Sequence, residues 1–164
     1  MVSSRLMRYL IAIVVTGLIV LWPTLPMHAG AVDSYVIRYL RVREPVPLVL
    51  NHQGETRLFS PEDLTQGKQL FEDNCKNCHV GGSTLPDPTR SLSLATLKAA
   101  TPPRDNIESL VAFQREPVAY DGSEDSVWCR QVSENWMSTE ELTNLEAFIL
   151  RAAETAPAWG TEEF

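Results

Sequence analysis

Two cysteines and a histidine lie close together in the run Cys75-Lys76-Asn77-Cys78-His79. Each thiol can add to one vinyl group of a haem, and the two-residue spacing places both sulfurs on one side of the backbone. His79 then lies beneath the iron and supplies the proximal imidazole. Zinc needs four ligands, and the sequence has no second motif of this kind; a redox disulfide would want a βαβ context, which is missing. The pattern therefore predicts one covalent c-type haem.

The N-terminal residues have the features of an export signal. Arg5 and Arg8 precede an apolar run, Tyr9–Trp22, and Ala29-Gly30-Ala31 matches a signal-peptidase site. The apolar run has 14 residues, whereas a helix needs roughly 20 to span a bilayer. We therefore expect residues 1–31 to be a cleaved signal peptide and residues 32–164 to be the mature domain. Export agrees with the haem motif, because c-type haems are attached in compartments such as the periplasm and the thylakoid lumen.

The predicted mature chain is acidic. The whole chain has a formal charge of −7, and removal of the two arginines in residues 1–31 makes it −9. Nucleic acid is therefore an improbable partner, and a basic or cation-bridged protein surface is a more natural one. The acidity could equally serve only to keep an exported protein soluble, and composition does not separate these two explanations.

The residue pattern predicts a short hairpin followed by several helices. Residues 32–59 form an N-terminal extension, whose basic segment 32–43 is either a partner-binding arm or an edge strand, and a β-hairpin turning at Gly54. Ser60 caps a helix that runs into the haem motif, and Ser93 caps a short helix. Asp105 is expected to cap the next helix, which ends before Pro117.

A capping box at residues 138–141 opens the last strong helix, which has apolar residues on one face. In a class I cytochrome c, a helix near the N-terminus crosses one near the C-terminus beside the haem. The helix after Ser60 and the helix after Ser138 suit these two roles. The fold class predicted is therefore all-α, a class I-like monohaem cytochrome c with a short N-terminal β-hairpin.

Three runs carry a more specific resemblance: residues 75–82 (CKNCHVGG), 100–108 (ATPPRDNIE) and 120–122 (YDG). They resemble the cytochrome c550 family, the low-potential extrinsic cytochromes on the lumenal face of cyanobacterial photosystem II. The similarity extends from the hairpin near Val46 to Trp159-Gly160. The resemblance implies that Asn106 lies over a haem edge near a propionate, and it suggests a paralogue that could substitute for cytochrome c550.

The sequence departs from the family at the distal haem ligand. The family has a second histidine shortly after Tyr-Asp-Gly, whereas here no histidine follows His79 and Cys129 holds the equivalent place. A thiolate is a known haem ligand, and a bound metal deprotonates a thiol. We therefore expect His79 and Cys129 to ligate the iron. The alternatives are Met137, His52, or an open or water-bound sixth site.

The expected function is that of a low-potential electron carrier or an extrinsic subunit of photosystem II. It would reside in the thylakoid lumen, bound peripherally through photosystem II proteins, with an unknown redox partner. Two alternatives are a structural subunit with incidental redox activity and a haem protein that binds small ligands at a labile sixth site. No acid–base pair, phosphate loop or nucleophile triad is present, so we do not expect an ordinary enzyme.

Overall fold

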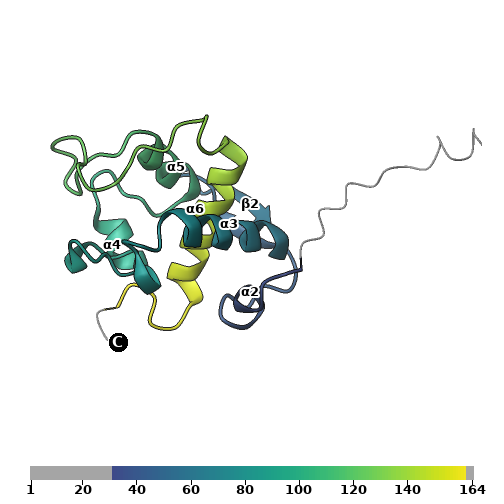
Figure 1. Cartoon of the computed structure of the whole chain (residues 1–164). Helices are drawn as coiled ribbons and strands as arrows, with labels where there is room; N and C mark the ends of the chain where they lie inside the picture. The colour runs from purple at the N-terminus through teal and green to yellow at the C-terminus, as the bar shows by residue number, and fades with distance from the viewer. Residues whose placement is uncertain (1–30, 162–164) are drawn as a thin grey trace, which may run out of the picture.

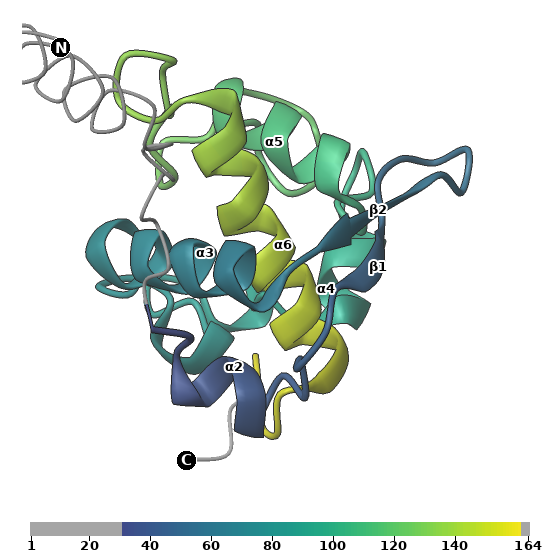
Figure 2. The same cartoon turned by 90° about the vertical axis from the view of Figure 1, so that its right-hand side faces the viewer.

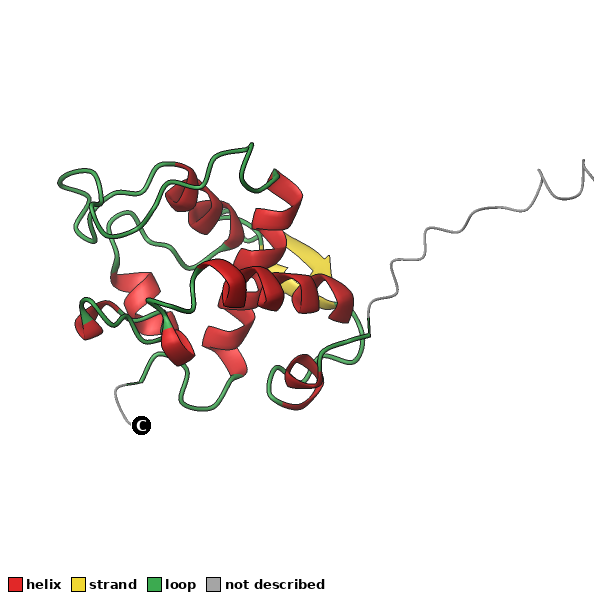
Figure 3. Ribbon diagram, in the orientation of Figure 1, coloured by secondary structure: helices red, strands yellow, loops and turns green. Residues whose placement is uncertain are grey.

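The computed structural model describes residues 31–161, so the predicted signal peptide lies almost entirely outside the described residues. Figures 1 and 3 show helices arranged around a long C-terminal helix, with a single small hairpin. The elements in chain order are α2 (Ser34–Arg38), β1 (Val46–Val49), β2 (Thr56–Phe59), α3 (Pro61–Asn74), the 3₁₀ turns η1 (Val80–Gly82) and η2 (Pro88–Arg90), α4 (Leu94–Ala99), α5 (Ile107–Arg115) and α6 (Thr139–Thr155).

Both long helices begin at the capping signals that the sequence predicts. Ser60 accepts a hydrogen bond from Asp63 N at the start of α3, and the Asp63 carboxylate accepts one from Ser60 N. Ser138 and Glu141 make the same reciprocal pair at the start of α6. Each pair satisfies two backbone N–H groups that the first turn of a helix leaves without a partner. The two helix starts are therefore determined locally.

Helices α3 and α6 cross in close contact, as Figures 1 and 2 show from two directions. A Cβ atom added at Gly67 would lie 1.9 Å from Asn144 O, so only glycine permits this approach. Phe71 and Phe148 pack beside the crossing with ring centroids 5.5 Å apart, and Trp159 lies 5.5 Å from Phe71. This aromatic group extends the core from the crossing to the C-terminal segment.

The structure changes one local expectation in the N-terminal segment. Residues 34–38 of the N-terminal extension form the short helix α2, not an extended strand, with Asp33 accepting from Tyr35 N at its N-cap. The hairpin itself forms as predicted, with Val46 opposite Phe59. None of the helices in residues 31–161 is long and apolar enough to cross a membrane.

Candidate haem site

The cysteine motif begins where α3 ends. Cys75 is the C-cap of α3, and its N–H donates to Phe71 O over 2.8 Å. Both Cys78 N and His79 N donate to Cys75 O over 3.0 Å. One carbonyl oxygen therefore gathers the backbone of the motif into a single turn. The end of α3 therefore fixes the short backbone turn from which both thiols and the imidazole project.

The side chain of Thr84 determines which nitrogen of His79 carries a proton. Thr84 Oγ1 lies 3.0 Å from His79 Nδ1 and 2.6 Å from Arg90 O. A carbonyl oxygen can only accept, so Thr84 donates its proton to Arg90 O and accepts from Nδ1–H. Burial also lowers the pKa of His79, which favours the neutral ring. The remaining nitrogen, Nε2, is then unprotonated, the form that binds iron.

Cys129 lies in the same region as the motif, although it is distant in sequence. Burial is the main cause that raises the pKa of Cys75 to about 12 and that of Cys129 to about 11, and the ionised forms of Glu146 and Cys78 contribute to both values. The ionised form of Cys129 also raises the pKa of Cys75, so the two thiols lie within range of a direct charge interaction. All three cysteines are free thiols. The fold thus brings the odd cysteine beside the predicted attachment site.

Arg104 places a positive charge in this region and holds the start of the loop that carries Cys129. Its Nη2 donates to Val118 O over 3.1 Å and to Ala119 O over 2.9 Å. The guanidinium carbon lies 3.9 Å from the centroid of the Phe113 ring. The charge of Arg104 lowers the pKa of the Cys129 thiol, against the larger effect of burial and the charge of Glu146. Sequence reasoning missed this residue, because its partners are backbone carbonyls.

Asn106 is the N-cap of α5, so the prediction that Asp105 caps this helix is wrong. The Asn106 side chain accepts from Ser109 N over 3.0 Å and is 2 % exposed. Its Nδ2 also lies 3.1 Å from Nδ1 of His52, which is exposed at the hairpin turn. The capping role therefore accounts for the side-chain oxygen of Asn106, and the position of Asn106 over a haem edge stays a prediction.

Met137 and Glu146 are both buried; burial suits the apolar methionine but disfavours the charged form of the glutamate. The side chain of Met137 is 3 % exposed and packs in the hydrophobic core. Glu146 is fully buried on α6, and neither of its carboxylate oxygens has a hydrogen-bond partner. Burial raises its pKa to about 8, so the carboxyl is mostly neutral at pH 7. Glu146 lies at helical spacing from Leu142 and Ile149, which indicates a position facing the core, but an acidic residue is not expected in a core.

The residues around the motif suit a large apolar cofactor. Val80 and Leu85, which follow the motif, are 41 % and 54 % exposed, while Val127 and Trp128, which precede Cys129, are 86 % and 78 % exposed. Exposed apolar side chains on two segments that meet at the thiols would be covered by a haem plate. The unprotonated Nε2 of His79 would be available as a ligand for the haem iron. The donor set therefore fits a covalently attached haem.

Comparison with known proteins assigns the chain to a family. A family model described as the cytochrome c-550 domain matches residues 39–164. The chain belongs to the cytochrome c-550 family. This confirms the predicted resemblance, the class I-like cytochrome c fold and a single covalently bound c-type haem. The domain boundary predicted at residue 32, and the individual ligand assignments, stay predictions.

Two relatives and one solved structure illustrate the similarity. A cytochrome c-550-like protein of Thermosynechococcus vestitus (strain NIES-2133 / IAM M-273 / BP-1) is 63% identical over 142 residues, 87% of this chain and 81% of the relative. The photosystem II extrinsic protein V of Gloeobacter violaceus (strain ATCC 29082 / PCC 7421) is 52% identical over 133 residues, 81% of this chain and 72% of the relative. The crystal structure of the PsbV2 cytochrome from Thermosynechococcus elongatus matches with a TM-score of 0.78 and 65% identity, covering 79% of this chain and 99% of that one.

The bond between Thr84 and His79 can be tested by substitution. Thr84→Val removes the acceptor for Nδ1–H, so we expect iron to bind the His79 imidazole about 10 to 100 times more weakly. Because protons compete with iron for this nitrogen, the acid midpoint of His79 release should rise by about one pH unit per tenfold loss. Acid titration of the ferric absorption spectrum measures this midpoint. The control is Thr89→Val, whose hydroxyl bonds the exposed Asp87 over 2.6 Å; equal midpoints in the two variants would contradict the assignment.

Burial of Glu146 predicts a pH dependence of stability. Below the unfolded pKa of 4.5, the carboxyl is protonated in both the folded and unfolded states. Between pH 4.5 and about 8 only the unfolded state is ionised, so this group lowers the free energy of unfolding by up to about 1.4 kcal/mol per pH unit. Glu146→Gln should remove this slope and be more stable than the parent protein at pH 8.

The measurement is chemical denaturation of the holoprotein at pH 5, 6, 7 and 8, with the exposed Glu62→Gln on α3 as the control. The control should keep the pH slope of the parent protein. If Glu146→Gln keeps the same slope too, Glu146 is ionised in the folded protein and the prediction is wrong.

Proposed function

We propose that this cytochrome acts at the lumenal face of photosystem II, as a low-potential electron carrier or as an extrinsic subunit. The observation that supports this function is the 52% identity with the photosystem II extrinsic protein V of Gloeobacter violaceus. The higher identity with a protein named only cytochrome c-550-like supports a paralogue of the extrinsic subunit. The excess of acidic residues would favour a basic or cation-bridged docking surface.

The proposal assigns a role to each predicted site residue. Cys75 and Cys78 attach the haem by thioether bonds, and His79 binds the iron through Nε2. Cys129 is the distal ligand, and Asn106 lies near a haem edge. The support for Cys129 is its shared environment with Cys75 and Cys78 and the positive charge that Arg104 brings to its thiolate form.

The ligand pair bears on the redox potential. When bound, the haem supplies a one-electron ferric/ferrous couple. An anionic sulfur stabilises ferric iron, so ligation by Cys129 favours a low potential, whereas Met137 would raise it. The burial of Met137 in the core supports Cys129 as the ligand.

One observation favours a second function, that of a haem protein with a labile sixth site. Burial raises the pKa of Cys129 to about 11, which favours the neutral thiol, and a neutral thiol is a poorer metal ligand than a thiolate. If the iron does not keep this sulfur deprotonated, small molecules would reach the sixth position. The spectroscopic experiment below distinguishes the two functions.

The proposed location predicts co-purification with photosystem II. We expect the protein in isolated photosystem II membranes at low salt and in the wash at about 1 M NaCl, because salt shortens the screening length from about 10 Å at 0.1 M to about 3 Å. Immunoblots of membrane and wash fractions measure this. Recovery of the protein only in the soluble lumenal fraction at low salt would argue against a photosystem II subunit and leave the carrier role.

The proposed ligation predicts the effect of Cys129→Ser. The ferric protein should show a thiolate-to-iron charge-transfer band, and the variant should lose it. We also expect the midpoint potential to rise by something on the order of 0.1 V, a fraction of the roughly 0.8 V that axial ligands control. Absorption spectroscopy and redox titration measure both quantities.

Met137→Leu and His52→Gln are the matched controls, because they remove the two competing protein ligands. Both should keep the band and the potential of the parent protein. A parent protein that lacks the band and binds cyanide or imidazole rapidly, or a Cys129→Ser variant that keeps the spectrum and the potential of the parent, would overturn ligation by Cys129.

A further inference from the structure

The segment that carries Cys129 folds back onto the end of α5. The carbonyls of Gln114 and Arg115, in the last turn of this helix, have no partner within the helix. Val132 N donates to Gln114 O over 2.8 Å, and Gln131 Nε2 donates to Arg115 O over 2.8 Å. The returning chain therefore closes the C-terminal end of α5, only two residues after Cys129.

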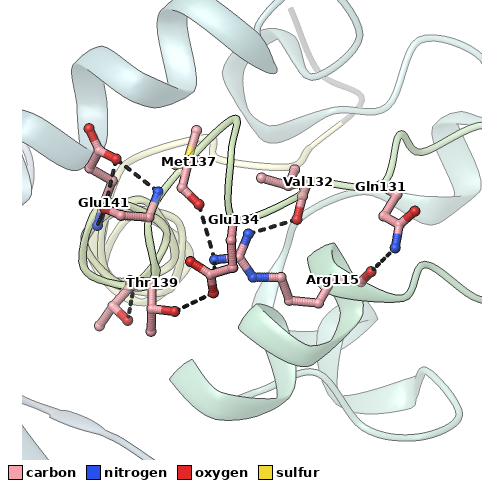
Figure 4. A network of polar contacts seen from close by, with 9 residues as sticks. Arg115, Gln131, Val132, Glu134, Met137, Thr139 and Glu141 are labelled. Carbon is pink, nitrogen blue, oxygen red and sulfur yellow. Dashed lines mark hydrogen bonds and ion pairs between the residues drawn. The ribbon is translucent and has the colours of Figure 1, made fainter.

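The Arg115 side chain fastens the same segment at three further points, which Figure 4 shows. Nη1 donates to Val132 O over 2.7 Å, while Nη2 donates to Met137 O over 3.0 Å and to a carboxylate oxygen of Glu134 over 2.8 Å. The same Glu134 oxygen accepts from Thr139 Oγ1 over 2.6 Å, at the first residue of α6. The planar guanidinium of arginine carries several N–H donors and can make these bonds at the same time, whereas the ammonium of a flexible lysine side chain is less suited to them.

The residues just before Cys129 pack little against the rest of the polypeptide. Val127 and Trp128 are largely exposed, and the Cys129 sulfur lies 3.7 Å from Gln114 Oε1 on α5. The place of this sulfur therefore depends on the hydrogen bonds that anchor the loop on its two sides. Arg104 anchors the earlier side through residues 118 and 119, and Arg115 anchors the later side.

We propose that Arg115 is a positioning residue for the haem iron: by fastening residues 132–137 to the end of α5, it presents the Cys129 sulfur to the iron and keeps the Met137 sulfur in the core. Cys129 precedes the segment that Arg115 holds by three residues, and Met137 is its last residue. A shift of this segment would move both sulfurs, so one guanidinium controls which of them can bind. The inference rests on the proposed ligation by Cys129.

The test compares ferric Arg115→Met with the parent holoprotein. We expect the thiolate-to-iron band to weaken and a second low-spin or high-spin form to appear. Added imidazole should displace the sulfur about tenfold faster, the change expected when one charge-assisted hydrogen bond is lost. Stopped-flow absorption with imidazole as the probe, together with the resting spectrum, measures both effects. Arg115→Lys should show the same defects in milder form.

Arg151→Met is the matched control. The Arg151 side chain is 19 % exposed, the same as that of Arg115, and it also bonds a remote backbone carbonyl, Leu40 O over 3.1 Å, and a carboxylate, that of Glu154. It lies on α6, outside the Cys129 segment. Its loss should lower the free energy of unfolding but leave the charge-transfer band and the imidazole rate unchanged.

The possible results separate the two proposals. A parent protein without a thiolate band contradicts the ligation by Cys129, and the role of Arg115 fails with it. If the parent protein has the band and Arg115→Met keeps both the band and the imidazole rate, the proposed role of Arg115 is contradicted, while ligation by Cys129 still holds. If Arg115→Met does not fold, Glu134→Gln decides the matter, because it removes only the exposed end of the network and should raise the imidazole rate; an unchanged rate would overturn the inference.

Discussion

The contact between the backbones of α3 and α6 at Gly67 is the constraint on which the haem site depends. A side chain of any size at this position would meet the carbonyl of Asn144, so the two helices cross at minimal separation. Gly67, Phe71 and Cys75 follow one another at four-residue intervals along one face of α3. The crossing therefore places Cys75, the first of the two predicted attachment cysteines, because α3 ends a fixed two turns after the contact and Phe71 packs the space between.

The buried carboxyl of Glu146 sets an electrostatic condition on the same site. An ionised carboxylate and an ionised thiolate repel each other strongly in a region from which water is excluded. The raised pKa of Glu146 keeps it mostly neutral at pH 7, so a negative charge on Cys129 does not meet a second one. The positive charge of Arg104 acts in the same direction. A thiolate is thus better tolerated here than the burial of Cys129 alone would suggest.

The sequence allowed prediction of those features that depend on residues close together in the chain. The starts of α3 and α6, the hairpin turn at Gly54 and the cysteine motif all depend on groups a few residues apart. The cap of α5 was assigned one residue early, because Asp and Asn cap helices equally well and only the backbone conformation selects Asn106. The helix α2 was missed, because its mixed pattern of Tyr and Arg residues suits a strand as well.

The bonds of Thr84, Arg104 and Arg115 were beyond prediction, since each joins a side chain to a carbonyl that sequence spacing does not identify. The site therefore divides into two parts with different physical origins. The proximal part, from Cys75 to His79, is continuous in sequence and follows from the motif, while Thr84 and Arg90 add a nearby support that the motif does not reveal.

The distal part is assembled from separate segments, and arginine side chains hold its loop through backbone carbonyls. Such carbonyls are present whatever side chains the loop carries, and Val127 and Trp128 lie outside the core. An exchange of the residue at position 129, the proposed distal ligand, therefore leaves the crossing of α3 and α6 intact. This independence explains physically how one cytochrome fold can accommodate a cysteine where the resemblance to cytochrome c550 implies a histidine.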